Sequence, residues 1–161
     1  MWVSHDRDEV FRNCDQVCVV EAGCSRPVVT PHELFVNPRT ASTAQLSGCH
    51  NIVAVRPAGG AVIVDGWGLK LECARAVEPD VTAIGLRAHH LYFTGEGEPN
   101  AMACRLVRSL DNVFSTIVIL RPEGAPAQAP NLSLEIAKEK LPQLQERMFV
   151  AIAPENILLL K

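Results

Sequence analysis

Short apolar runs broken by glycine, proline and polar residues fill most of the chain, a pattern typical of β-strands rather than long helices. From about residue 51 onward these runs alternate with turn residues. Turns at Gly59-Gly60 and Asp65-Gly66 predict a three-strand meander over the first strands. A polar loop over 95–100 separates two groups of strands, and a helical turn is expected at 139–144. The predicted strands are 51–55, 61–64, 69–73, 81–86, 90–93, 102–110, 115–120, 132–136, 149–152 and 157–160.

The first fifty residues have a different, partly helical pattern. Asp6 can cap a helix whose first turn is acidic, because a side-chain oxygen there accepts from free backbone N–H groups. Gly48 is a natural left-handed end for a later helix. The elements predicted here are helices over 6–13, 31–35 and 40–46 and a β-branched strand over 16–21.

Two stretches far apart in the chain have the same layout. Residues 81–91 and 148–158 each contain an apolar strand, a small-residue kink, a polar pair and a second strand. Similar segments at matching positions indicate a structural repeat. We therefore predict two related five-strand units.

Composition limits the function classes. The chain has 161 residues, 48% hydrophobic and 20% charged, with a net charge of −3 and 15 scattered Lys and Arg residues. A chain of this kind is expected to fold and not to bind nucleic acid, which requires a basic surface. No apolar run approaches the roughly 20 residues that span a bilayer. Charged residues by position 6 do not fit a signal peptide, so we expect the protein to stay where it is made.

We predict no metal site. The cysteines lack a Cys-x-x-Cys pair, and reduced thiols acting as small core residues are expected. His89-His90 falls on a predicted strand, where adjacent side chains face opposite sides and cannot chelate one ion together. The six cysteines are Cys14, Cys18, Cys24, Cys49, Cys73 and Cys104.

An ordered series of residues gives the first indication of function. It begins with Ser4-His5-Asp6 and runs through residue 51. Its later members are Glu9-Val10, Cys14-Asp15-x-Val17, Val19-Val20, Gly23, Pro31-x-Glu33, Pro38, Ala44, Gly48 and Asn51. This series resembles the end of the nucleotide-binding domain, and the start of the regulatory domain, of ABC importer ATPases.

The remainder of the chain resembles the oligomer-binding-fold accessory domain of the same proteins, with residues 85–89 and 154–157 at its two closures. Gly48-Cys49-x-Asn51-Ile52 and Asp65-Gly66-Trp67-Gly68 look most like the molybdate importers. The resemblance implies a mainly β chain: an oligomer-binding-like (OB-like) β-barrel of two five-strand units after a short α/β remnant of an ATPase domain. The domains expected are 1–47 and 48–161, the latter divided into 48–95 and 100–161.

In the family, a histidine at the position of His5 reads the γ-phosphate of ATP and helps to orient the attacking water. ATP and Mg²⁺ are cofactors of the intact family. This sequence has no Gly-x-x-x-x-Gly-Lys-Ser/Thr loop to hold the phosphates. We therefore expect no ATPase activity from this chain alone, and no cofactor.

An oxyanion such as molybdate is held by N–H and hydroxyl donors, often with one lysine. The family's two donor motifs fall on Ile136–Lys140 and near Ala153-Pro154-Glu155, where the hydroxyls are missing. Glu155 would also repel a dianion. The remaining candidates for weak oxyanion binding are the donor cluster and two lysines: Ser109, Asn112, Ser115, Thr116, Lys138 and Lys140.

Two functions from different classes follow from the resemblance. The first is a regulatory and dimer-forming domain of an importer ATP-binding subunit, for molybdate or a related oxyanion, at the cytoplasmic face of the inner membrane. Its partners would be a second copy and the transporter's membrane subunits. The alternative is a free-standing oxyanion-binding protein. A conventional enzyme using His5 or the cysteines lacks a recognisable set of nucleophile, base and orienting group.

Overall fold

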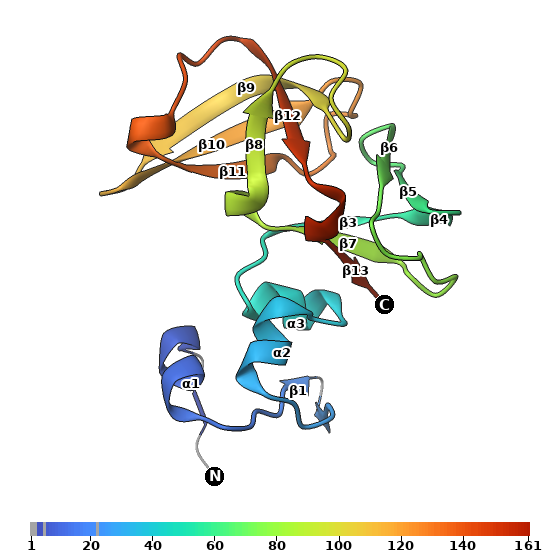
Figure 1. Cartoon of the computed structure of the whole chain (residues 1–161), viewed down its shortest axis with the longest axis vertical. Coiled ribbons are helices and arrows are strands. Elements are labelled where there is room, and N and C mark those ends of the chain that lie inside the picture. The colour runs from blue at the N-terminus through green and yellow to red at the C-terminus, as the bar shows by residue number, and fades with distance from the viewer. Residues whose placement is uncertain (1–2, 5, 22) are drawn as a thin grey trace.

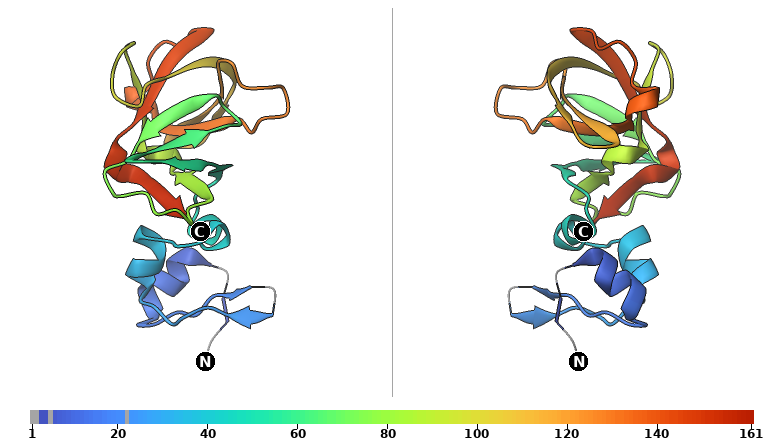
Figure 2. Two further views of the ribbon diagram at one scale, coloured as in Figure 1. Left: turned by 90° about the vertical axis from the view of Figure 1, so that its right-hand side faces the viewer. Right: turned by 90° about the vertical axis from the view of Figure 1, so that its left-hand side faces the viewer.

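The computed structural model describes residues 3–4, 6–21 and 23–161. Figure 1 shows a small helical region beneath a larger β-structure, and the side views in Figure 2 place the two at opposite ends of the molecule. We call the described residues up to Ser47 the helical segment, and residues 48–161 the β-domain. The mainly β fold expected from the sequence is confirmed.

The helical segment contains three short helices and a two-stranded hairpin. Each predicted helix is present and begins at a capping side chain: Asp6, Thr30 or Thr40 accepts from a backbone N–H of the first turn. The strand predicted over 16–21 is wrong in extent, because only its last two residues pair as β1, and Val17 forms a single bridge with Val29. The elements are α1 (Arg7–Asn13), β1 (Val20–Glu21), β2 (Cys24–Ser25), α2 (Pro31–Val36) and α3 (Ala41–Leu46).

The β-domain contains three sheets and three 3-10 turns. The sheet orders are β13-β7-β3, β4-β5-β6 and β11-β10-β9-β12-β8, and all pairings are antiparallel. The strands are β3 (Asn51–Ala54), β4 (Arg56–Ala58), β5 (Ala61–Val64), β6 (Leu69–Glu72), β7 (Ala83–Leu86), β8 (Leu91–Thr94), β9 (Met102–Asp111), β10 (Ser115–Pro122), β11 (Leu132–Ala137), β12 (Arg147–Ile152) and β13 (Ile157–Leu160). The 3-10 turns are η1 (Ala88–His90), η2 (Lys138–Lys140) and η3 (Pro154–Asn156).

The predicted meander is shifted by one strand. The meander consists of β4, β5 and β6, whereas β3 leaves it and pairs with β7. The helical turn expected at 139–144 is the single 3-10 turn η2. The first difference concerns which strands pair, and the second concerns the length of a turn.

The two halves of the β-domain exchange their last strands. In the first half β7 leads through η1 into β8, and in the second β12 leads through η3 into β13. β8 then pairs with β12 of the other half, and β13 pairs with β7. The orders β13-β7-β3 and β8-β12-β9 are therefore equivalent, so the two matching closures are placed alike. The halves are not both five-strand units, because the first contains β3 to β8 and the second β9 to β13.

The core lies between the sheets of the β-domain. Trp67 is 1% exposed and its indole N–H donates to the carbonyl of Pro130 at 3.0 Å. Asn51 links two sheets from a buried position: its amide donates to Leu86 and Ser133 carbonyls and accepts from the Ser133 N–H. Cysteine behaviour is mixed: Cys49 and Cys104 are buried, but Cys14 and Cys73 are only partly buried and Cys18 and Cys24 are exposed, so the expectation of core thiols holds for two of the six.

Candidate functional site

The donor cluster predicted from the sequence lies at the β9–β10 hairpin end. Its hydroxyls are already used: Ser115 Oγ donates to Glu135 at 2.8 Å, and Thr116 Oγ1 donates to Asp111 at 2.9 Å. The Asn112 N–H is bonded to the Ser115 carbonyl across the turn. Ser109 is exposed and pairs with Val118 in the ladder. The carboxylates of Glu135 and Asp111 thus take up the hydroxyl donors that a dianion would need, and they would also repel it.

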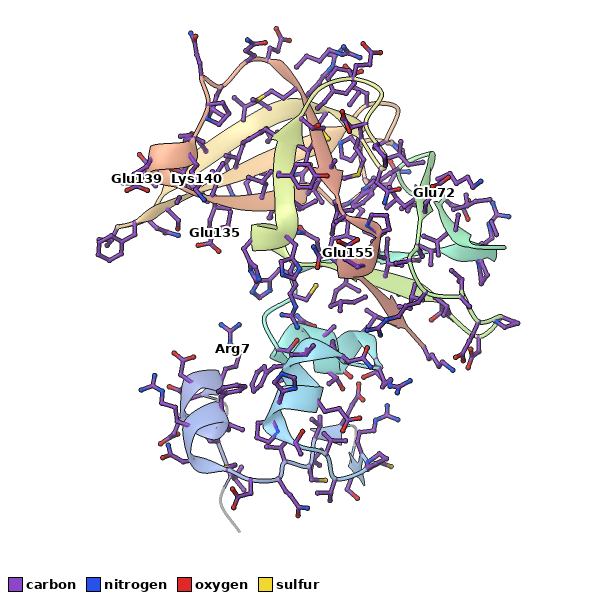
Figure 3. All side chains as sticks on the ribbon, viewed as in Figure 1. Arg7, Glu72, Glu135, Glu139, Lys140 and Glu155 are labelled. Atoms are coloured by element: carbon purple, nitrogen blue, oxygen red, sulfur yellow. The ribbon has the colours of Figure 1, made fainter. Side chains whose placement is uncertain are left out.

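The two predicted lysines lie close to this hairpin but do not enclose a site. Lys138 and Lys140 begin and end η2 and are exposed, with Glu139 between them. The Lys138 N–H donates to the Phe114 carbonyl at 3.2 Å. Figure 3 shows Glu135, Glu139 and Lys140 at this same end of the β-domain. The mixed charges are typical of a solvated surface.

Two predicted histidine features have different outcomes. His5 lies outside the described residues. His89 and His90 are not on a strand: they lie in η1, where their ring centroids are 4.4 Å apart and the rings meet edge to face. The strand-based argument about these two side chains is therefore wrong, because a 3-10 turn places neighbouring side chains on adjoining sides. Among the residues with assigned positions, no group of three or more metal-ligating side chains is found.

The structure brings together a different set of residues, at the junction between the helical segment and the β-domain. Arg87, between β7 and η1, reaches the helical segment. Its guanidinium donates to the Ser47 carbonyl at 3.0 Å, to Ser47 Oγ at 3.1 Å and to the Phe35 carbonyl. The last carbonyls of a helix have no partner within the helix. The Arg87 side chain supplies partners for the Phe35 carbonyl at the end of α2 and for the Ser47 carbonyl just after α3. We call these contacts the Arg87 tether.

Further contacts strengthen the junction. The Arg75 guanidinium donates to Asn37 Oδ1 at 2.9 Å, and the Lys161 N–H donates to the Arg39 carbonyl at 2.9 Å. Gly48, with φ of 88°, ends α3, and a Cβ there would overlap the guanidinium of Arg7. Figure 3 shows Arg7 pointing from α1 towards the β-domain. These contacts join the helical segment to both halves of the β-domain, since β7 and β13 take part.

Within the helical segment, α1 is held against α2. The rings of Phe11 and Phe35 pack edge to face, with centroids 5.7 Å apart. Phe35 also supplies a carbonyl to the Arg87 tether. A chain of contacts therefore runs from the β-domain through α2 to α1.

A cavity of about 430 Å³ lies beside the tether. It is lined by α2, by the loop after β6, by both closing turns η1 and η3 and by the start of β13. His90 Nδ1 is buried there without a hydrogen-bond partner. Burial lowers the pKa of His90, and the neighbouring charges of His89 and Arg87 lower it further. From the sequence, Arg87 was placed only within a closure motif and His89 was considered only there and as one of a histidine pair, so the junction was missed.

The curated proteins to which this chain is similar are ATP-binding proteins of importers, and each is matched over part of its length. No protein-family model matches the chain. It is 32% identical over 131 residues to the sulfate/thiosulfate import ATP-binding protein of Chromobacterium violaceum, covering 78% of this chain and 35% of that protein. It is 29% identical over 101 residues to the sn-glycerol-3-phosphate import ATP-binding protein of Cereibacter sphaeroides, covering 62% and 28%. The spermidine/putrescine import ATP-binding protein of Clostridium novyi is 32% identical over 85 residues, covering 50% and 23%.

The chain thus spans between 23% and 35% of the length of these curated relatives. Among solved structures, it is similar to the cytoplasmic molybdate-binding protein ModG with bound molybdate. The TM-score is 0.53 at 11% identity, covering 70% of this chain and 96% of that one. This likeness supports the OB-like fold. Across the part of the chain that the structure describes, no helix is long and apolar enough to cross a membrane.

Proposed function

We propose that this chain is the regulatory part of an importer ATP-binding subunit, and that its β-domain acts by positioning the ATPase part rather than by chemistry of its own. The Arg87 tether carries the proposal. A regulatory domain must be held firmly to the part that it regulates, and here one guanidinium joins β7 to both α2 and α3. The partial-length similarity to import ATP-binding proteins supports the same assignment.

In this proposal, movement of the β-domain reaches the ATPase part through the helical segment. The order is Arg87, then α2, then the Phe11–Phe35 contact and α1. In the resembled family, the residue that reads the γ-phosphate sits at the position of His5, just before α1. The chain itself is proposed not to hydrolyse ATP, because its sequence has no phosphate-cradling loop.

We further propose that the β-domain pairs with a second copy, on the cytoplasmic side, beside the membrane subunits of an importer. The β9–β10 hairpin end supports a pairing surface, because Val113 and Phe114 are 77% and 82% exposed, and Val107 and Leu110 of β9 are exposed as well. A group of exposed apolar side chains is typical of a surface that binds another protein.

The second candidate function is oxyanion binding, with molybdate as the first ion to test. The OB-like fold shared with the molybdate-binding protein ModG favours this candidate. The donor inventory is against it, because Ser115 and Thr116 donate to carboxylates. We therefore place it behind the positioning role.

One set of measurements on the purified chain tests both candidates. Light scattering after gel filtration gives the oligomeric state, calorimetric titration tests molybdate, sulfate and ATP, and a phosphate-release assay tests hydrolysis. The proposal predicts a dimer that Phe114→Glu converts to a monomer, with Val28→Glu as an exposed control, and no phosphate release. Tight binding of molybdate without sulfate would favour the oxyanion candidate, and ATP hydrolysis would contradict both.

A further inference from the structure

The junction cavity has an excess of positive charge that the protein does not balance. Two guanidinium groups, of Arg75 and Arg87, line it against one carboxylate, that of Glu155, and His89 and His90 complete its polar wall. Figure 3 shows Glu155 on η3, in the part of the β-domain above the helical segment. Within the described residues, neither Arg75 nor Arg87 has a carboxylate at salt-bridge distance. Their hydrogen-bond partners are the Asn37 amide and the hydroxyl and carbonyls of the tether, which leave both charges in place.

The wall of the same cavity holds a polar group without a partner. His90 Nδ1 is buried and has no hydrogen bond among the described residues. A turn of the His90 ring towards the cavity would let a ligand bond to this nitrogen and recover the free energy that an unpaired buried nitrogen costs. Two guanidinium groups beside an imidazole are the donors that bind tetrahedral oxyanion groups, since each supplies charge-assisted hydrogen bonds. The charges of this cavity therefore fit an anion.

The cavity is too large and too apolar on one side for a bare ion. Its volume of about 430 Å³ falls in the range of small organic ligands. Besides the charged residues, the lining includes the apolar side chains of Phe35, Val36 and Ile157. Glu155 would accept hydrogen bonds from hydroxyl groups while disfavouring a small dianion placed close to it.

We propose that the junction cavity binds a phosphomonoester: a tetrahedral oxyanion group carried on a small hydroxylated organic body. Arg75, Arg87, His89 and His90 hold the oxyanion group, while Phe35 and Ile157 contact the body and Glu155 accepts from its hydroxyls. The bound molecule contacts α2 and both closing turns at once, so it fastens the helical segment to the β-domain. This site lies apart from the donor cluster at the hairpin end. The proposal goes beyond the proposed function, because it adds a ligand site to a domain proposed to act by positioning.

The experiment is a calorimetric titration of the full chain with glucose 6-phosphate, with glucose, inorganic phosphate and molybdate as comparison probes. We expect binding of glucose 6-phosphate, no heat with glucose, and much weaker binding of the two bare ions. The titration is run at about pH 7.5, where the phosphate ester is a dianion and Arg75 and Arg87 carry the positive charge of the site.

Two matched variants place the binding in the cavity. Arg75→Gln removes an exposed guanidinium whose hydrogen bond within the described residues is to Asn37, so the fold is retained; we expect about tenfold weaker binding, equal to ~1.4 kcal/mol. Arg108→Gln removes an exposed arginine of β9 and should leave binding unchanged.

Three results would overturn the proposal: no binding of glucose 6-phosphate, equal binding of inorganic phosphate, or equal losses in the two variants. A chain that binds the ester but stays monomeric would contradict the pairing proposed above and leave this site standing.

Discussion

The helical segment and the β-domain are ordered by different means. The β-domain buries a continuous apolar core in which side chains such as Trp67, Leu71 and Leu120 are at most 1% exposed. Of the buried apolar side chains other than proline, the described part of the helical segment supplies Ala44. Leu34 and Phe35 are half-buried, and several other large apolar residues of this segment are exposed: Val3, Phe11, Val20, Val28, Val36 and Leu46.

This difference shows where each part gets its stability. The β-domain is stabilised by the burial of apolar surface, which is the main driving force of folding. The helical segment depends on capping hydrogen bonds and on polar contacts to the β-domain, above all the Arg87 tether. It is therefore the part that can be loosened without unfolding the other.

The largest effect is expected from the core of the β-domain. Trp67→Ala removes a fully buried ring and leaves the Pro130 carbonyl without its donor. We expect a loss of about 3–5 kcal/mol in the free energy of unfolding, measured by urea denaturation. Phe11→Ala, in the helical segment, should cost below about 1 kcal/mol because Phe11 is 53% exposed. Similar losses in the two variants would break the comparison.

A smaller effect is expected at Asn51, which joins the two sheet systems. Asn51→Ala leaves the Leu86 and Ser133 backbone groups unpaired in a buried place. The expected loss is about 2–3 kcal/mol in the same denaturation assay. Asn112→Ala at the exposed hairpin end is the matched control and should change little. An unchanged midpoint for Asn51→Ala would show that the sheets are held together in some other way.

Gly48 tests the boundary between the two regions. Gly48→Ala places a Cβ at a residue with φ of 88°, where it also displaces Arg7. We expect a loss of about 1–2 kcal/mol, seen by denaturation. Gly60→Ala, at a position with open space, should be close to neutral. Equal stabilities of the two variants would show that the backbone at residue 48 does not need glycine.

The smallest effect concerns pH. The pKa of His90 is lowered by burial in the folded state, so the unfolded chain takes up a proton first as the pH falls below about 6.5. Stability contributed by neutral His90 is therefore present near neutral pH and lost as the pH falls towards the lowered folded pKa. The difference in urea midpoint between about pH 7.5 and about pH 5.5 should shrink in His90→Gln. If His90→Gln shows the same difference in urea midpoint between the two pH values, the pH dependence comes from other groups.

Strand positions were predictable because apolar periodicity is a local signal, and the helix cap at Asp6 was readable for the same reason. Strand partners were not: β3 pairs with β7 through contacts distant in sequence. The junction was hidden for a further reason. Arg87 binds the backbone carbonyls of Phe35 and Ser47, and a carbonyl is present at every residue, so no residue type marks its partners.

The central claim is that Arg87 holds the helical segment to the β-domain, and hydrogen exchange measured by mass spectrometry tests it most directly. The comparison is between the unaltered chain, Arg87→Gln and Arg108→Gln. The account predicts faster exchange of α1, α2 and α3 amides in Arg87→Gln, with β-domain strands protected as before and Arg108→Gln unchanged. Unaltered exchange in the three helices, or loss of protection throughout the β-domain, would contradict it.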